Sequence, residues 1–305
     1  MKSAWNQLRP AMVPYVWGAV ALGYGLGHWD GARPMGGLGS LLATLVAWLL
    51  LQAGTMWWNA ATDRDEGPVL WGRPGTPPPV PLAVATLIAA VVVAFWASAA
   101  IGVTAALCAA LAAAYSAERT RWKGHPWGGP VVNVVGYGLA TPYAGFAASG
   151  APLTPRVAIL GAIFVSAVAS LYLVAQAFQA DEDRRRGDRT YVARYGALST
   201  VLAARWCLDT AGVLALGMVL AGWLPRSLLL GLPFGLVLRS TLILGGTSPS
   251  PAWASAVAAA MLRTALVALA ILSAQYVVDD LSGRPVAGLG TARGLPLFHG
   301  SSTYP

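Results

Sequence analysis

The stretch NAATDRDEGPVLWGRP, residues 59–74, closes an apolar run that begins near Leu41, and it places three carboxylates within four residues. An apolar run of about 20 residues is long enough to cross a bilayer as a helix. Charge is scarce elsewhere, since only 10% of the 305 residues are charged and 56% are hydrophobic. A soluble domain of this composition would have too little polar surface to cover itself. We therefore expect an integral membrane protein in which this acidic segment ends a spanning helix.

Nine apolar runs have about the length of a membrane helix. They cover residues 10–27, 38–58, 80–98, 100–116, 130–149, 156–178, 199–222, 226–244 and 253–277. The runs predict an all-α bundle of nine transmembrane helices, a single domain over residues 1–280, and an irregular polar tail over residues 281–305. Only the glycine of ASAAIG separates the third run from the fourth, so one long bent helix is an alternative there. No small-residue cleavage site follows the first run, which is interpreted as a retained span.

The basic residues predict the orientation of the bundle. Of the twenty Lys and Arg, twelve fall in the N-terminal segment or in loops after even-numbered runs, and five fall on the opposite side. The positive-inside rule then places the N-terminus in the cytoplasm and, with nine spans, the C-terminus outside. We expect a bacterial inner membrane. This distribution accounts for the net charge of +8 without a nucleic-acid partner, and Cys108 and Cys207, both in predicted spans, indicate neither a disulfide framework nor a thiolate metal site.

Seven of the twelve acidic residues lie in two patches, one within residues 59–67 and one within the stretch QAFQADEDRRRGDRT at 176–190. The patches close the second and sixth spans, so both should meet the cytoplasm. The C-terminal end of a helix carries partial negative charge, which makes clustered carboxylates unfavourable there unless a cation offsets them. Neighbouring arginines are one compensation, and a magnesium ion shared with substrate phosphates is another. Solvated interfacial anchors remain the alternative interpretation of either patch.

Helical spacing connects these patches to the bundle interior. Asn59 and Asp63 are four residues apart and share a helix face, and Gln176, Gln179 and Asp183 share another. A polar stripe that faces lipid is costly. We therefore expect both stripes to face a cavity inside the bundle.

These residues resemble the aspartate-rich motifs of the UbiA superfamily of intramembrane prenyltransferases, which have nine helices and one motif after each of helices two and six. The first motif is matched by Asn59, Asp63, Arg73 and Pro74. Its other aspartates fall on Ala60 and Gly67, with Asp65 or Glu66 as the nearest substitutes. The second motif is matched by Asp183, Gly187, Thr190 and Gly196, whereas its earlier aspartates fall on Gln176 and Gln179.

A third stretch, AYSAERTRWKGHPWGGPVVNVVGYG at 114–138, resembles the loop after helix four of that superfamily. The matching positions are Tyr115, Ser116, Lys123, Gly124, Pro126, Asn133 and Gly138, while Glu118 stands where a proline is common. The resemblance covers about residues 10–277.

The resemblance implies a Mg²⁺-dependent prenyltransferase that moves an isoprenoid chain from a prenyl diphosphate to an aromatic or similar lipophilic acceptor at the bilayer. The implied catalytic residues are Asp63, Tyr115, Lys123 and Asp183. The implied metal ligands are Asp63, Glu66 and Asp183. The implied substrate-binding residues are Asn59, Arg64, Arg73, Arg119, Asn133, Gln176 and Gln179. Tyr115, with Trp57 or Trp58, would face a carbocation through its ring.

Three rival functions stay open. A cyclase of prenyl diphosphates would use the same metal site without an acceptor, and the missing carboxylates favour a non-catalytic relative that binds a polyprenyl lipid. A transporter is supported only by ionisable residues within spans, which are functional candidates by default. Three such residues are Asp209, Arg239 and Arg263. Asp209 and Arg263 each lie about ten residues into their spans, so they could pair.

Overall fold

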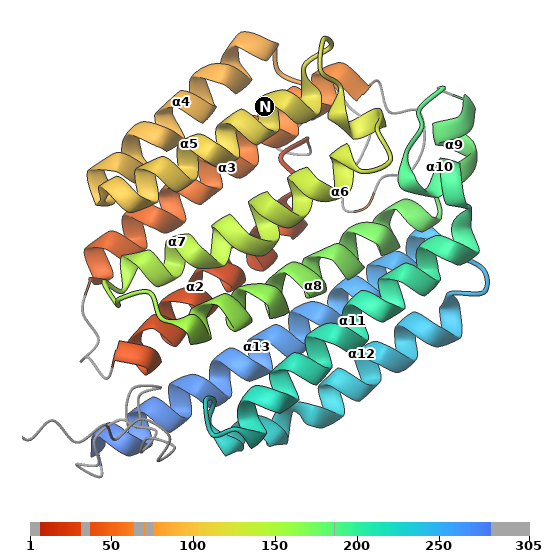
Figure 1. Cartoon of the computed structure of the whole chain (residues 1–305). Coiled ribbons are helices and arrows are strands. Elements are labelled where there is room, and N and C mark those ends of the chain that lie inside the picture. Colours follow the sequence, from red (N-terminus) through yellow and green to blue (C-terminus); the bar gives the residue numbers. More distant parts are fainter. Residues whose placement is uncertain (1–6, 32–36, 64–69, 71–75, 186, 282–305) are drawn as a thin grey trace, which may run out of the picture.

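The chain is all-helical over the residues that the computed structural model describes, which are 7–31, 37–63, 70, 76–185 and 187–281. The first half contains η1 (Pro10–Met12), α2 (Val13–Gly31), α3 (Leu38–Asp63), α4 (Val80–Ala97), α5 (Ala99–Ser116), η2 (Trp122–Gly124), α6 (Gly128–Asn133), η3 (Val134–Ala140) and α7 (Thr141–Ala148). The second half contains α8 (Pro155–Ala177), α9 (Ala180–Arg185), α10 (Tyr191–Tyr195), α11 (Ala197–Leu220), η4 (Arg226–Gly231), α12 (Leu232–Gly245) and α13 (Pro251–Leu281). Figure 1 shows one bundle, with α3, α4 and α5 at one edge and α11, α12 and α13 at the other.

Seven helices of the described chain are long and apolar enough to cross a membrane. They are α3, α4, α5, α8, α11, the combined η4 and α12, and α13. The all-α integral membrane fold is therefore confirmed, but the expected count of nine spans is not. The run predicted over residues 130–149 is divided into α6, η3 and α7, each of eight residues or fewer, and α2 is the other predicted span outside the seven. The predicted tail over residues 281–305 falls, after Leu281, outside the described residues.

Ser98 separates α4 from α5, so the alternative of one bent helix is wrong. Its backbone is extended, with φ −171° and ψ 160°, and its hydroxyl accepts a hydrogen bond of 3.2 Å from the backbone N–H of Ile101. A serine in this conformation is a favourable helix N-cap. The chain therefore reverses, and α4 packs against both α3 and α5.

The middle of the segment from α6 to α7 is a π-helix, η3. Pro142 lies just after it and has no N–H with which to continue the usual hydrogen-bond pattern. The hydroxyl of Thr141 donates to the carbonyl oxygen of Gly136, five residues earlier, at 2.9 Å. Such π segments widen a helix and often occur at functional sites.

Two glycines bring the backbones of α2 and α7 into direct contact. A Cβ atom on Gly23 of α2 would overlap the carbonyl oxygen of Pro142, and one on Gly145 of α7 would overlap the carbonyl oxygen of Val20. Small residues at helix interfaces allow this close approach in membrane proteins. The contact fixes α2 against α7.

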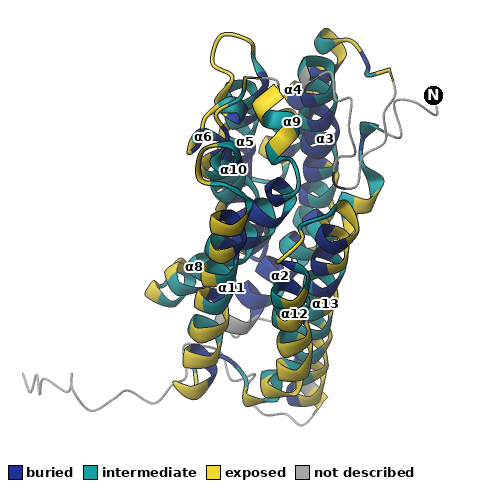
Figure 2. Ribbon diagram, turned by 90° about the vertical axis from the view of Figure 1, so that its right-hand side faces the viewer, coloured by how far each residue is buried: buried dark blue, intermediate teal, exposed yellow. Residues whose placement is uncertain are grey.

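Buried apolar side chains form three clusters. The first joins α2, α3, α4, α5 and α7; the second joins α8, α11, α12 and α13; the third joins α2 to α8, α11 and α13. Figure 2 shows exposed residues along the outward faces of α11 and α12, the surface that would face lipid. The short helices α6, α9 and α10 gather at one end of the bundle, beside the last turns of α8 (Figure 1).

Candidate active site

A cavity of about 1040 Å³ lies within the bundle and is lined by residues from both halves of the chain. Most of its lining is apolar, from helices α2, α8, α11, α12 and α13 among others. One group of polar side chains in the lining comes from the last turns of α3 and α8 and from the loops around η2 and α9. These include Asn59, Lys123, Gln176, Gln179, Glu182, Asp183, Asp188 and Thr190. The two polar stripes predicted to share a pocket therefore contribute to the same cavity.

Lys123 is the buried cation of this cavity, with 8% of its surface exposed. Its Nζ donates a hydrogen bond of 2.8 Å to Oγ1 of Thr62, near the end of α3. This contact joins the loop after α5 to the helix that carries the first acidic patch. A buried ammonium is costly unless negative or polar groups surround it, and Thr62 is one such group.

Asp183 is held by the short helices that follow α8. The hydroxyl of Thr190 donates to Oδ2 of Asp183 at 2.5 Å and also accepts from the N–H of Ala193, which caps α10. The backbone N–H of Arg189 donates to the carbonyl oxygen of Gly124 at 2.9 Å, which ties this loop to η2. The carboxylate of Asp183 and the ammonium of Lys123 are thereby mounted on one connected set of loops.

A chain of three polar side chains continues inward from α8. Nε2 of Gln176 donates to the hydroxyl of Tyr172 at 2.7 Å, and that hydroxyl is also hydrogen-bonded to Tyr115 of α5. Gln176 is 7% exposed, and its Oε1 has no hydrogen-bond partner among the described residues. Since Tyr172 fixes the amide through its nitrogen, the oxygen is left as a buried acceptor in the cavity wall. A buried acceptor without a partner is unfavourable, so this oxygen is available to a donor or a cation that enters the cavity.

The tyrosine hydroxyl requires a glycine opposite it. A Cβ atom on Gly129 of α6 would overlap the hydroxyl oxygen of Tyr172. On the same segment, Nδ2 of Asn133 donates to the carbonyl oxygen of Gly129 at 2.9 Å, so the side chain of Asn133 lies along its own helix. Asn133 also lines the cavity.

A second polar contact crosses the cavity deeper in the bundle. The hydroxyl of Tyr137, in the π segment, donates to Oε1 of Gln52 on α3 at 3.2 Å. Gln52 lies two turns before Asn59, and Tyr172 one turn before Gln176, so each extends a predicted stripe inward. Sequence reasoning did not single out Gln52, Tyr137 or Tyr172, although this helical spacing could have identified the first and third.

Three aromatic rings pack together beside the α9–α10 loop. The ring centroids of Trp127 and Tyr191 are 5.4 Å apart, and those of Tyr191 and Tyr195 are 4.7 Å apart. Burial, chiefly, raises the pKa of Tyr191 above its usual value. Aromatic residues of this kind commonly mark a membrane–water interface.

Several predicted site residues are not brought to this cavity. Arg119 is exposed on the loop and does not line the cavity, and neither Trp57 nor Trp58 lines it. Trp58 instead packs against the first apolar cluster. The side chain of Asp63 and the residues Arg64, Asp65, Glu66 and Arg73 lie outside the described part of the chain.

The prediction that Asp209 could pair with Arg263 is wrong. Asp209 pairs instead with Arg239 of α12 and with Arg205 of its own helix. Arg263 lies on an exposed face of α13. Similar depth along two helices does not establish that their side chains face each other, and α11 borders α12 in this region.

Acidic and thiol groups do not gather into a preformed metal centre over the described residues. No group of three or more His, Cys, Asp or Glu there is placed to hold a metal ion. Of the predicted ligands, only Asp183 has a described side chain. A cation at this end of the cavity would need further oxygen donors from a ligand, as magnesium commonly takes from phosphates and water.

The bundle is similar to solved structures of UbiA homologues. It aligns with a UbiA homologue from Archaeoglobus fulgidus bound to DMAPP and Mg²⁺ at a TM-score of 0.62 and 15% identity, covering 89% of this chain and 99% of that one. The chain has the UbiA fold. The apo structure of a UbiA homologue from Aeropyrum pernix K1 aligns with this UbiA-fold chain at a TM-score of 0.61 and 19% identity, over 88% of this chain and 98% of that one. No protein-family model matches the sequence, and no curated protein matches it.

A further UbiA-fold structure is a digeranylgeranylglyceryl phosphate synthase, which aligns at a TM-score of 0.60 and 15% identity over 89% of this chain and 98% of that one. The predicted UbiA fold is thus confirmed. The chemistry of this UbiA-fold chain has to be argued from its own residues.

Proposed function

We propose that this UbiA-fold chain is a membrane prenyltransferase that transfers an isoprenoid chain from an allylic diphosphate to a lipophilic acceptor. The observation that carries the proposal is the gathering of Lys123, Asp183 and Gln176 around one largely apolar cavity. Polar groups of both signs suit a diphosphate with its cation, and the apolar lining suits the chain. Homologues with the same fold have been solved with DMAPP or GPP and Mg²⁺, which supports this substrate class.

In this proposal, Lys123 binds the diphosphate. Its ammonium is buried, so its attraction to phosphate oxygens is weakly screened by water. Asn59, which is 6% exposed and lines the same cavity, supplies a further polar group. Arg64 and Arg73 are proposed to add positive charge from the segment after α3.

The donor set at this end of the cavity fits magnesium. The Asp183 carboxylate and the buried Oε1 of Gln176 are oxygen donors of the kind that Mg²⁺ prefers, and the ion usually takes its remaining ligands from phosphates and water. Asp63 and Glu66 are proposed to complete the set. When bound, Mg²⁺ supplies positive charge that stabilises the leaving diphosphate.

The residues of this chain then favour ionisation of the substrate. The bond between the allylic C1 carbon and the diphosphate oxygen breaks, and pyrophosphate leaves with the electron pair, bound by Lys123. The positive charge left on the allylic carbons is stabilised by the ring face of Tyr115, which lines the cavity. The acceptor supplies the electron pair for a new bond to C1, and its proton passes to the released pyrophosphate. The apolar cavity wall excludes water that would otherwise capture the carbocation.

The site is proposed to face the cytoplasm. The helix ends and loops that carry it also hold most of the Lys and Arg residues, as the positive-inside rule requires of a cytoplasmic face. A bacterial inner membrane is the proposed location.

The experiment uses purified protein in detergent with Mg²⁺ and labelled DMAPP or GPP, and it measures pyrophosphate release. Asp183→Asn should lower the rate by about 100-fold, because it removes a charged ligand. Asp181→Asn is the matched control: its side chain is 87% exposed and pairs only with Arg184 among the described residues. Equal rates in the two variants would contradict the role of Asp183.

The products separate the rival functions. Release without an added acceptor, together with a cyclic hydrocarbon, would identify a cyclase. Saturable binding of the diphosphate without release would identify a non-catalytic lipid-binding protein. This alternative is favoured by Gln176, whose neutral amide stands where the resembled motif has an aspartate.

A further inference from the structure

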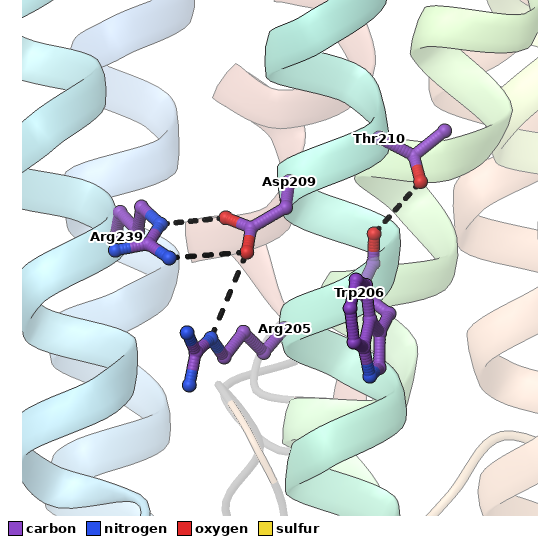
Figure 3. A network of polar contacts seen from close by, with 5 residues as sticks. All are labelled: Arg205, Trp206, Asp209, Thr210 and Arg239. Atoms are coloured by element: carbon purple, nitrogen blue, oxygen red, sulfur yellow. Dashed lines mark hydrogen bonds and ion pairs between the residues drawn. The ribbon is translucent and has the colours of Figure 1, made fainter.

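A second charged cluster lies between α11 and α12, within the predicted membrane. Figure 3 shows Asp209 on α11 facing Arg239 on α12, with Arg205 one turn earlier on α11. Oδ1 of Asp209 accepts from Nε of Arg239 at 2.6 Å, and Oδ2 accepts from NH2 of Arg239 at 3.2 Å. The Nε atom of Arg205 is 3.6 Å from Oδ2 of Asp209. At about 1.5 Å per residue, Asp209 is roughly 18 Å along α11 from Ala197, near the middle of the bilayer.

The cluster carries more positive charge than its own carboxylate balances. Two guanidinium groups face one carboxylate, which leaves a net charge of +1. Asp209 accepts from two N–H donors of Arg239 and is ion-paired with Nε of Arg205. Each guanidinium group has five N–H donors, so both arginines keep donors that Asp209 does not use. The side chains of Arg205 and Arg239 remain 44% and 41% exposed. These donors are therefore open to a ligand.

A net charge at this depth is costly unless it serves a partner. Ionisable side chains inside a bilayer are rare and normally pair or face a polar pathway. An ion pair that only held α11 to α12 would need a single arginine. The second arginine adds cost without adding a bidentate contact, because Arg205 meets Asp209 only at 3.6 Å. An anionic group at the two guanidiniums would remove this cost.

An apolar groove continues from the cluster toward the other face of the membrane. Asp209 and Arg239 line the large cavity, as do Gly212 one turn further along α11 and Gly235 one turn before Arg239 on α12. A Cβ atom on either glycine would meet nothing within 4 Å. Space is therefore open at these two glycines, and α11 packs chiefly against α8 and α12 chiefly against α13.

The sides of this groove are hydrophobic. Leu216 of α11 and Leu232 and Leu236 of α12 line it, and all three are exposed on the protein surface. The groove is therefore open toward lipid and can receive an alkyl chain.

We propose that the Arg205–Asp209–Arg239 cluster binds the acidic head of a single-chain amphiphile that enters from the membrane between α11 and α12. The head, a carboxylate or a phosphate monoester, accepts hydrogen bonds from the guanidinium groups, which present planar paired donors suited to such anions. The alkyl chain lies in the groove beside Gly212 and Gly235. This site uses other residues of the same cavity than the diphosphate site at Lys123, and its occupation does not depend on prenyl transfer.

The test measures binding of labelled dodecanoic acid, dodecyl phosphate and dodecanol to the full chain in phosphatidylcholine nanodiscs, relative to empty nanodiscs. Saturable binding is expected for at least one of the two acids and not for the alcohol, and the tighter acid identifies the head group. Arg239→Gln and Arg205→Gln should each weaken that binding about tenfold or more, because a charged hydrogen-bond donor is lost. Asp209→Asn should strengthen it, because the competing carboxylate is gone.

Arg226→Gln is the matched control, since it removes an exposed arginine at the start of η4 and should leave binding unchanged. Thermal unfolding shows whether each variant is folded. If Arg239→Gln is not folded, the binding measured with Arg205→Gln and Asp209→Asn tests the proposal. Equal binding of acid and alcohol would overturn the proposal. So would acid binding that neither arginine substitution lowers, which is the result expected of a purely structural ion pair.

Discussion

Nζ of Lys123 lies 2.8 Å from Oγ1 of Thr62 and donates a hydrogen bond to it, across sixty-one positions of sequence. This bond brings the loop after α5 to the end of α3. In the proposed function, Thr62 directs the ammonium group toward the diphosphate, and the next helical residue is the first aspartate of the predicted metal set.

Lys123→Met should lower pyrophosphate release from DMAPP or GPP by about 100-fold or more, because a buried positive charge is lost from the leaving group. Thr62→Val keeps the charge and loses only its positioning bond, so a reduction of about tenfold or less is expected. Steady-state rates measured with each variant check this order. A larger loss in Thr62→Val than in Lys123→Met would contradict it, and Arg226→Gln serves as the remote control.

Gln176→Leu should raise the Mg²⁺ concentration needed for half-maximal pyrophosphate release, because it removes the buried Oε1 acceptor. Tyr172→Phe retains that oxygen but frees the amide to turn, since Nε2 loses its acceptor. A smaller rise is therefore expected for Tyr172→Phe. Magnesium titrations of both variants give the comparison, and identical curves for wild type and Gln176→Leu would show that this amide does not contribute.

Gly23→Ala should destabilise the bundle by about 1–3 kcal/mol, because its methyl group overlaps the carbonyl oxygen of Pro142. Gly18→Ala, on the same helix, is the control, since a Cβ atom there meets nothing within 4 Å. Thermal unfolding in detergent should therefore show a lower midpoint for Gly23→Ala and no loss for Gly18→Ala. A shared midpoint would argue against the backbone contact.

Arg121→Gln should change stability by less than about 1 kcal/mol, although it removes a 3.2 Å ion pair with Asp188. The arginine side chain is 48% exposed, so water screens the pair. Gly124→Ala should cost more, because its methyl group would lie 2.7 Å from Oδ1 of the same aspartate. The unfolding midpoints of the two variants test this prediction. A larger loss of midpoint in Arg121→Gln than in Gly124→Ala would contradict it.

The sequence was sufficient to predict the membrane class, the fold and several polar residues of the cavity lining. Asn59, Gln176 and Asp183 follow from helical spacing, because residues three or four apart share a face whatever the helix packs against. The break at Ser98 was a local signal that was overlooked, since a serine before an apolar run is a common N-cap. The role of Tyr172 could not be established, because its hydroxyl depends on the glycine of another helix.

Partner choice inside the bundle was equally beyond the sequence. Asp209 was paired with Arg263 on depth alone, whereas the rotation of each helix about its axis decides which arginine it meets. That rotation depends on packing among several helices, which no single run of residues encodes.

The backbone contact between α2 and α7 has a consequence for how a product could leave. Because α2 and α7 touch through Gly23 and Gly145, separating them would lose packing along both helices, and no product should pass between them. Between α11 and α12, by contrast, Gly212 and Gly235 border open space. In the proposed function, a prenylated product is therefore expected to leave sideways into lipid between α11 and α12.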